Sequence, residues 1–449
     1  MTAAFTVPRL QQTLVRLVPD ALRERYCVAF SGGVDSAVLL HAMAMLREGF
    51  PGLAVRAVHV NHHLQTRAAD WARHCREFAA GVGVDCEVLD VRVVVPRGES
   101  TEAAARTARY SALSQALGEG ELLLTAHHRD DQLETLLLHL LRGAGVAGLD
   151  GMPESAVLGR GRLLRPLLDV DHSELVAYAQ AAGLNWIEDP SNADTRFDRN
   201  YLRQRVLPVL RERWPAAASG ASRTARHLAE AQALLEERAQ EDLALARTGA
   251  NLRVSAVRAL DPARARNLLR FWIARAGCRV PSSTVLDQVL WQMLNARDDA
   301  QPLIKWGDVE LRRYRDALYL GRSALCTPPE AMVWDWRGRA ELELPAGLGR
   351  LRLRPARRGE AAFAAPLQPL RVEWQCGSQR LQLAAGAPRR TLRNLFQEHG
   401  VVPWMRPCLP LLFVGESVAA VADLWIDAAF QSRDAGGEVL EWLDHPAIF

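Results

Sequence analysis

The chain has 449 residues, of which 49% are hydrophobic and 24% are charged, and its formal net charge is +3 at pH 7. This length is too great for a single hydrophobic core, so two or three domains are expected. The composition is ordinary for a soluble globular protein, and the total charge alone does not indicate binding to nucleic acid.

The sequence shows no apolar run long enough to cross a bilayer, and residues 1–14 lack the pattern of a secretory signal. The seven cysteines are scattered and form no C-x-x-C pair, which argues against a disulfide framework and against a thiolate zinc site: Cys27, Cys75, Cys86, Cys278, Cys326, Cys376 and Cys408. We therefore expect a protein of a reducing compartment, most simply the cytoplasm, with no membrane association.

The first 168 or so residues alternate short β-rich runs with amphipathic helical stretches. Helical spacing predicts helices at 35–46, 67–80, 100–117 with Ser100 as its cap, and 130–142 with Gly143 at its end. Strands are predicted before them, at 27–30, 54–60, 86–95 and 121–125. This alternation predicts an α/β fold with a parallel sheet covered on both faces, which binds ligands at the carboxyl ends of its strands.

The rest of the chain changes character several times. Asp171 and Glu174 form a capping box that opens another helix. Beyond it we predict an Arg-rich polar stretch at 188–213, helices at 216–247 and 283–294, strand-like alternation at 305–320, a linker at 326–348 and a basic helix at 389–399 among short β-runs. We predict a catalytic domain at 1–215, a mainly helical middle domain at 216–330 and a small α+β domain at 345–449.

The most informative segment is Ser31-Gly-Gly-Val-Asp-Ser36, between a predicted strand and a predicted helix. Gly32 and Gly33 let the backbone approach a ligand closely, and the amides there form an anion cradle with the first N–H groups of the helix. Asp35 repels phosphate unless a magnesium ion lies between them. The alternative is a Gly-Gly turn with Asp35 as a helix cap.

This loop lacks the G-K-[ST] of a Walker A motif and resembles the loop of the N-type ATP pyrophosphatases, the PP-loop superfamily. Three more segments fit that resemblance: 59–64 (HVNHHL), 105–110 (ARTARY) and 125–135 (TAHHRDDQLET). Arg106 and Arg109 share a helix face, and Asp131 and Glu134 lie three apart at a helix start, where carboxylates suit a magnesium ion or an amine. Taken singly, each segment also has a purely structural reading.

Together the segments resemble the tRNA(Ile)-lysidine synthetase family. The resemblance is dense over the first 210 or so residues and good over the last 60. It extends to 142–149 (RGAGVAGL), 165–168 (RPLL), 188–192 (EDPSN), 199–203 (RNYLR), 392–397 (LRNLFQ), 403–406 (PWMR) and 409–413 (LPLLF). Leu202 stands where the family often has isoleucine, which is a conservative departure.

The resemblance implies an ATP-dependent enzyme that adenylates the wobble cytidine of a tRNA(Ile) with a CAU anticodon and then couples L-lysine to it. It implies ATP contacts by Ser31, Gly32, Gly33, Val34, Asp35, Ser36 and His59. Asp35 and Asp131 would hold Mg²⁺, and Asp35, Asp131 and Glu134 would be catalytic, with Asp131 or Glu134 receiving the ammonium proton. Contacts to tRNA or substrate would come from Arg106, Arg109, His127, Arg199, Asn200, Arg203, Arg393 and Trp404.

Three other interpretations remain open from the residues. A tRNA thiolase of the same superfamily would carry a C-x-x-C motif, which this chain lacks. A small-molecule amidating ligase would bring a glutaminase portion, and none is evident. A tRNA-binding protein with a decayed nucleotide site is disfavoured by the intact loop and carboxylates. The sequence leaves the oligomeric state open, a homodimer included.

Overall fold

The computed structural model describes residues 4–63, 67–95, 101–297, 300–322, 328–357, 360, 362–364, 368–374, 379–432, 437–446 and 448, without the side chain of Glu102. The chain divides into two compact units, Met1–Leu235 and Glu236–Phe449. No helix in the described ranges is both long enough and apolar enough to span a membrane. Leu64, Ser100, Cys326 and Cys376 lie outside these ranges.

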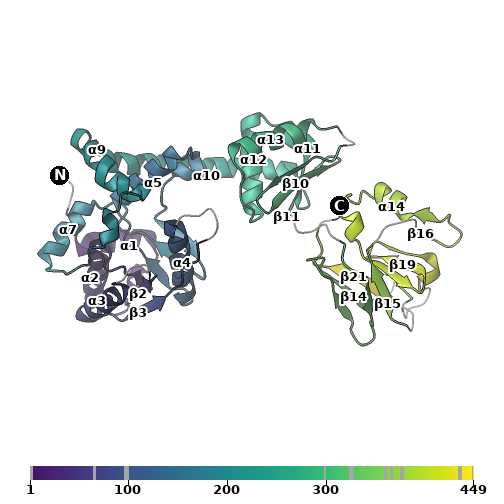
Figure 1. Ribbon diagram of the computed structural model, residues 1–449, viewed down its shortest axis with the longest axis horizontal. Helices are drawn as coiled ribbons and strands as arrows, with labels where there is room; N and C mark the ends of the chain where they lie inside the picture. The colour runs from purple at the N-terminus through teal and green to yellow at the C-terminus, as the bar shows by residue number, and fades with distance from the viewer. Residues whose placement is uncertain are drawn as a thin grey trace. The chain divides into compact units, whose positions relative to one another are not determined.

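The first unit is built on a six-stranded sheet of order β3-β2-β1-β4-β6-β5 (Figure 1). All neighbouring strands pair in parallel except β5 and β6, which form an antiparallel hairpin at one edge. The strands are β1 (Arg25–Ala29), β2 (Ala54–Asn61), β3 (Cys86–Asp90), β4 (Leu122–Leu124), β5 (Ser155–Leu158) and β6 (Gly161–Leu164). The parallel α/β prediction is therefore confirmed, and the strand order reverses between β1 and β4.

Helices cover both faces of this sheet, because alternate residues of each strand point to opposite sides. Tyr26 and Val28 pack with α1 (Val7–Leu17), α2 (Val34–Gly49), α3 (Ala68–Gly81) and α7 (His172–Ala181). Cys27 packs on the other face with Leu113 of α4 (Thr101–Ala116). Figure 1 shows α2 and α3 on one side of β2 and β3 and α4 on the other.

The first unit differs from the predictions in several details, among them the β5–β6 hairpin, which was not predicted. The third strand ends at Asp90 instead of Val95, because β2, the strand that pairs with it among the described residues, itself ends at Asn61. The Val-rich run beyond it pairs with no strand in the part of the chain that the structure describes, and Val94 is exposed. The structure also contains α1, which was not predicted and which packs its buried Leu10 and Leu14 into the core of the sheet domain.

The Arg-rich stretch follows the last strand of the sheet in the sequence and packs against α5 (Arg129–Leu141) of the same domain. After α5 and the short α6 (Val146–Leu149), α7 begins at the predicted capping box of Asp171 and Glu174. The predicted polar stretch forms a 3₁₀ turn (Pro190–Ala193), α8 (Asp198–Tyr201), a π-helical turn (Leu202–Val206) and α9 (Leu207–Arg213). π-helical turns are rare and occur often at functional sites.

The boundary between the units falls within α10 (Ala217–Ala246). The middle of the chain contains both predicted helices, α10 and α13 (Ser283–Asn295), with α11 (Val254–Arg258) and α12 (Pro262–Arg275) between them. These pack on a five-stranded antiparallel sheet: β7 (Arg247–Thr248), β8 (Asn251–Arg253), β9 (Leu303–Trp306), β10 (Val309–Tyr314) and β11 (Ala317–Arg322). The predicted strand-like run 305–320 is thus three strands, with tight turns at Gly307 and Arg315, which both have positive φ.

The last part of the chain has three antiparallel sheets around one core. Their strands are β12 (Met332–Trp334), β13 (Glu341–Glu343), β14 (Arg350–Pro355), β15 (Leu370–Glu373), β16 (Arg380–Leu381), β17 (Arg390–Thr391), β18 (Leu411–Val414), β19 (Ser417–Val421), β20 (Trp425–Ile426) and β21 (Glu438–Leu443). The predicted basic helix 389–399 is shorter, because the Thr391 hydroxyl caps α14 (Leu392–Glu398) by accepting a hydrogen bond from the Asn394 amide, 3.4 Å away. Arg389 and Arg390 precede the helix.

Candidate active site

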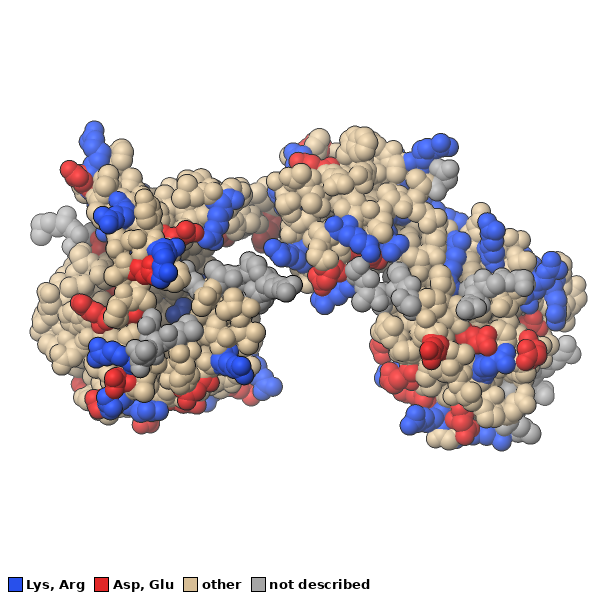
Figure 2. Space-filling view, viewed as in Figure 1, with Lys and Arg blue, Asp and Glu red and all other residues tan. Residues whose placement is uncertain are grey.

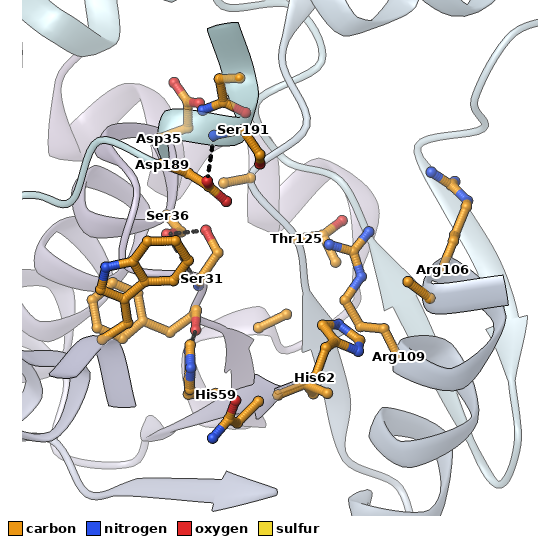
Figure 3. A pocket seen from close by; sticks show the side chains of 18 of the residues that line it. Ser31, Asp35, Ser36, His59, His62, Arg106, Arg109, Thr125, Asp189 and Ser191 are labelled. Carbon is orange, nitrogen blue, oxygen red and sulfur yellow. Dashed lines mark hydrogen bonds between the residues drawn. The ribbon is translucent and has the colours of Figure 1, made fainter. Parts of the chain in front are cut away.

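A cavity of about 840 Å³ lies at the carboxyl ends of β1, β2 and β4, where the strand order reverses. Open α/β sheets bind their ligands at this position. The predicted residues that line it are Ser31, Asp35, Ser36, His59, Arg106, Arg109, His127, Asp131, Arg199, Asn200 and Arg203. Figure 3 shows the loop serines on one side of the cavity and the α4 arginines on the other.

Hydroxyl groups hold the loop between β1 and α2 in a closed turn. The Ser31 and Ser36 Oγ atoms lie 3.0 Å apart, and Ser36 Oγ donates to the Gly33 carbonyl at 3.0 Å and accepts from the Ser31 amide at 3.3 Å. Gly33 is the N-cap of α2, so the loop leads directly into the first N–H groups of that helix, which have no acceptor within the helix. Free amides at a helix N-terminus attract anions such as phosphate.

Gly32 is required by both its backbone conformation and its surroundings. Its φ of +86° is one that side chains rarely adopt. A Cβ at this position would lie 2.9 Å from Ile187 Cδ1 and 3.1 Å from Cys75 Sγ. The Gly32 carbonyl also accepts a hydrogen bond from the Ile187 amide at 2.8 Å, so the chain after α7 holds the loop in place.

His59, at the end of β2, is buried beneath the loop. Its Nδ1–H donates to the Phe30 carbonyl at 2.9 Å, and Cys75 Sγ lies 3.3 Å from the same nitrogen. Burial lowers the pKa of His59 from its ordinary value. The imidazole is therefore a neutral group that fixes the backbone just before Ser31, while its exposed edge faces the cavity.

The opposite wall carries cationic side chains from α4. The guanidinium carbons of Arg106 and Arg109 lie 5.2 and 5.5 Å from the ring centroid of Tyr110. Burial lowers the pKa of Arg109. Tyr110 raises it, whereas the positive charges of Arg106 and Arg199 lower it further. No carboxylate within the described ranges forms an ion pair with Arg109. A half-buried guanidinium of this kind attracts an anionic ligand.

Next to Arg109 the wall is formed by neutral imidazoles. Burial lowers the pKa of His127 to about 3, and its Nδ1 lies 2.9 Å from Thr125 Oγ1. Burial also lowers the pKa of His62, followed by the charge of Arg109. Figure 3 shows the His62 ring beside Arg109. These rings can donate or accept hydrogen bonds but carry no charge near neutral pH.

Asp131 is one of the carboxylates that line the cavity. Burial raises its pKa, but the charges of His128 and Arg199 and a hydrogen bond from the His128 amide outweigh burial, so the pKa falls to about 2. Its carboxylate also accepts from Arg203 Nη2 at 3.2 Å. A carboxylate with so low a pKa is a weak base but a persistent anion, suited to a cation or an ammonium group.

Glu134, predicted to be catalytic, lies apart from the residues that line the cavity. It is fully buried, does not line the cavity, and accepts from Arg203 Nε at 2.7 Å through one oxygen and from Arg199 Nε at 2.9 Å through the other. Asp130, its neighbour on α5, pairs with Arg211 at 2.7 Å. Both carboxylates therefore hold arginines of the 188–213 segment against α5, and this geometry does not favour Glu134 as a proton acceptor for an amine.

Asp35 lies where the loop, α5 and α7 meet. Burial raises the pKa of Asp35, against the opposing charges of His128 and His172, and Asp131 raises it further. Its Oδ1 is buried and has no hydrogen-bond partner among the described residues. His128 Nε2 lies 3.7 Å from one carboxylate oxygen and His172 Nε2 lies 3.5 Å from the other. A cation between Asp35 and a phosphate would supply a partner for the Oδ1 atom of this carboxylate.

Two predicted substrate contacts lie in the second unit. Arg393 is exposed on α14. Trp404 is partly buried, with its ring centroid 5.1 Å from that of Tyr319 and the Arg312 guanidinium 5.1 Å from its ring centre. These neighbours belong to β10 and β11, so Trp404 packs against the middle sheet and presents only part of its surface for stacking.

Several residues of the site were not among the predicted ones. His128 and His172 face Asp35, and the cavity wall includes Trp71, Asp189, Ser191 and Phe197. The predicted Asn200 is fixed in the cavity wall, because its amide donates to the carbonyls of Ser191 (2.8 Å) and Asp194 (3.0 Å). Polar residues clustered at 188–194 were visible in the sequence, whereas nothing local to His172 distinguishes it from an ordinary helix-start residue.

A parallel sheet with a Ser-Gly-Gly loop at its switch point, facing carboxylates and arginines, defines an ATP-binding protein of the PP-loop class. Residues 7–210 match the PP-loop domain family, residues 252–319 the TilS substrate binding domain and residues 370–442 the TilS substrate C-terminal domain.

Curated relatives resemble nearly the whole chain. A tRNA(Ile)-lysidine synthase of Alkalilimnicola ehrlichii is 48% identical and covers 91% of each chain. Those of Coxiella burnetii and Pseudomonas aeruginosa are 38% and 43% identical and cover 98% and 97% of this chain and 96% and 97% of their own. This chain belongs to the tRNA(Ile)-lysidine synthase family.

Proposed function

We propose that this chain uses ATP to adenylate the 2-carbonyl oxygen of the wobble cytidine in tRNA(Ile) with a CAU anticodon. It then joins the ε-amine of L-lysine to the base carbon that carried this oxygen. The product is lysidine, which changes codon reading from AUG to AUA, and AMP and pyrophosphate are released. The observation that carries the proposal is the cavity at the strand-order reversal, which combines the Ser31–Ser36 loop with Asp35, Asp131 and Arg109. Membership of the family supports the same reaction.

The loop binds the phosphates of ATP. The amides at the start of α2 and the hydroxyls of Ser31 and Ser36 supply donors at one wall of the cavity. Mg²⁺ held by Asp35 and Asp131 would neutralise the charge that develops on the departing pyrophosphate. The buried Asp35 oxygen without a hydrogen-bond partner and the ionised Asp131 suit such an ion.

The cationic wall receives the RNA. Arg106 and Arg109 meet the negative charge of the tRNA backbone or of the α-phosphate as the cytidine enters. The neutral His127 donates or accepts at the base edge, since a pKa of about 3 keeps it uncharged. Phe197, also on the wall, offers an apolar surface to a base that must be turned out of its stack.

Lysine is positioned by charge. The persistent anion of Asp131 attracts the ε-ammonium group, which is charged near pH 7. A pKa of about 2 makes Asp131 too weak a base to keep the ammonium proton, so the proton leaves to solvent before the amine attacks. Glu134 acts as a positioning residue, because it fixes Arg199 and Arg203 at the cavity edge and does not meet the amine itself.

The second unit contacts the body of the tRNA. The catalytic domain comprises residues 1–215, and the tRNA-binding domains comprise residues 216–330 and 345–449. On the face that Figure 2 shows, arginine and lysine side chains are scattered among acidic ones. The exposed Arg393 is suited to a phosphate contact. Trp404 packs against Tyr319 and Arg312 and so contributes mainly to the structure of this unit. We place the reaction in the cytoplasm, where uncharged tRNA, lysine and ATP meet.

The substitution Asp35→Asn tests the proposal. With tRNA and ATP but no lysine, the native protein should release pyrophosphate and accumulate adenylated tRNA. Asp35→Asn should slow this step by about 10²–10³-fold while the protein stays folded, because a charge that acts on the transition state is lost. The matched control is Asp70→Asn, an exposed carboxylate that pairs with Arg67 and Arg73 of its own helix.

Mass spectrometry of the tRNA nucleosides identifies the product. Lysine added to cytidine supports the proposal, whereas a sulfur-containing base or no modified base contradicts it. Pyrophosphate release that requires lysine but not tRNA would mean that the enzyme activates the amino acid instead.

A further inference from the structure

Three side chains from separate elements meet beside the phosphate loop. Asp35 comes from the first turn of α2, His128 immediately precedes α5, and His172 is the first residue of α7. One ligand atom from each, a carboxylate oxygen or an imidazole nitrogen, lies within 4.8 Å of both others. Neither histidine lines the large cavity, so the cluster is a separate feature that shares Asp35 with it.

These atoms are spaced somewhat more widely than the ligands around one small metal ion. His128 Nε2 and His172 Nε2 lie 3.7 and 3.5 Å from the two oxygens of Asp35. In a tetrahedral site with bonds of about 2.1 Å, neighbouring ligand atoms are about 3.4 Å apart. An ion therefore fits with small side-chain movements. Asp131 Oδ2, 3.4 Å from His128 Nε2, stands at hand as another ligand.

The ligand types select the class of ion. Mg²⁺ prefers oxygen ligands throughout, whereas two imidazoles and a carboxylate are a common set for Zn²⁺ and for ions that substitute for it. His128 is nearly fully buried, and the His172 side chain is 44% exposed. The buried ligand fixes the ion, and the open side gives it access and leaves room for water.

We propose that Asp35, His128 and His172 form a site for a divalent transition-metal ion of the Zn²⁺ or Co²⁺ class in the ATP-free protein. Occupation of this site removes Asp35 from the Mg²⁺ that accompanies ATP, so the ion competes with Mg–ATP. This second statement rests on the proposed role of Asp35 in ATP binding, whereas the site itself does not.

The site is tested by adding Co²⁺ to the metal-stripped full chain without ATP. We expect one equivalent to bind, to give the intense visible absorption of a tetrahedral Co²⁺ complex, and to be displaced by Zn²⁺. His172→Ala should weaken Co²⁺ binding at least tenfold and reduce that absorption. The matched control is His227→Ala, an exposed histidine near Glu230 on α10, which should change neither. Equal Co²⁺ affinity in His172→Ala and native protein overturns the site.

Competition is tested separately by measuring Mg–ATP affinity with and without Zn²⁺. Zn²⁺ should weaken Mg–ATP binding to the native protein and have at least tenfold less effect on His172→Ala. If Co²⁺ binds through His172 but Zn²⁺ leaves ATP affinity unchanged, the competition is wrong and the site stands. Failure of ATP to bind at all, with Co²⁺ binding intact, instead contradicts the proposed function.

Discussion

Two arginine-rich regions of this molecule pair the same types of residue, two arginines and a glutamate, but differ in how deeply the glutamate is buried. At the edge of the active-site cavity, Arg199 and Arg203 hold a glutamate that is fully buried. On the sheet of β14 and β21, Arg352 and Arg354 hold Glu441, which keeps contact with solvent. The sequence gives both regions several arginines and a glutamate. The burial of the glutamate side chain distinguishes the pair that fixes the geometry of the site from the pair that lies on a surface.

The difference is physical. Removing one partner of a buried ion pair leaves a desolvated charge, whereas water replaces a lost partner at the surface. Charged surface pairs are also screened by salt, and buried ones much less. Substitution of the glutamates in the two regions should therefore give very different losses of stability.

The largest effect is expected from Glu134→Gln. The amide keeps the volume of a fully buried side chain but removes the charge that Arg199 (22% exposed) and Arg203 (44% exposed) share, which should cost about 2 kcal/mol of unfolding free energy. Urea unfolding of the full chain measures the loss, and hydrogen exchange of the α5 amides assigns it to the first unit. A loss below about 1 kcal/mol would place this pair with the surface pairs and remove the contrast.

An intermediate effect is expected from Glu121→Gln, in the sheet domain but away from the cavity. Burial opposes the charge of Glu121, yet hydrogen bonds from Arg56 at 2.7 and 2.6 Å and from the Gly118 amide lower its pKa below the ordinary value. Since Arg56 is 29% exposed, we expect a loss of only about 1.5 kcal/mol at pH 7.

The pH dependence of that loss sharpens the comparison. A carboxylate with a lowered folded-state pKa stabilises the protein fully above its unfolded pKa, about 4.3. The stabilisation disappears as the pH falls from there through the folded-state pKa. The difference between native protein and Glu121→Gln should thus be constant from pH 8 to about pH 5 and vanish on further acidification. A difference that persists at low pH would show that packing, and not charge, is responsible.

The smallest effect is expected from Glu441→Gln. Arg354 and then Arg352 lower the pKa of Glu441 through hydrogen bonds, but the group remains near the surface. We expect a loss of at most about 1 kcal/mol, which 1 M salt should reduce further. A salt-independent loss as large as that of Glu134→Gln would mean that the β14–β21 arginines are structural in the same sense as those of the cavity.

The sequence by itself determined the parts of this protein that depend on neighbouring residues. The Ser31–Ser36 loop, the capping box at Asp171 and the alternation of strands and helices are local patterns, and the structure has them where they were predicted. The family resemblance rests on such contiguous motifs and is confirmed by the comparisons. Local signals failed where a partner was needed: β3 ends with its neighbouring strand, and α14 begins at its cap.

The tertiary structure alone decided the role of individual charged side chains. Glu134 meets arginines 65 and 69 positions away, so its burial between them cannot be read from its place three residues after Asp131. In the same way, His172 faces Asp35 only because α7 packs beside α2, and Trp404 is covered by strands from the middle of the chain. The charge, hydration and accessibility of a group depend on everything within a few ångströms of it, and folding brings distant segments that close.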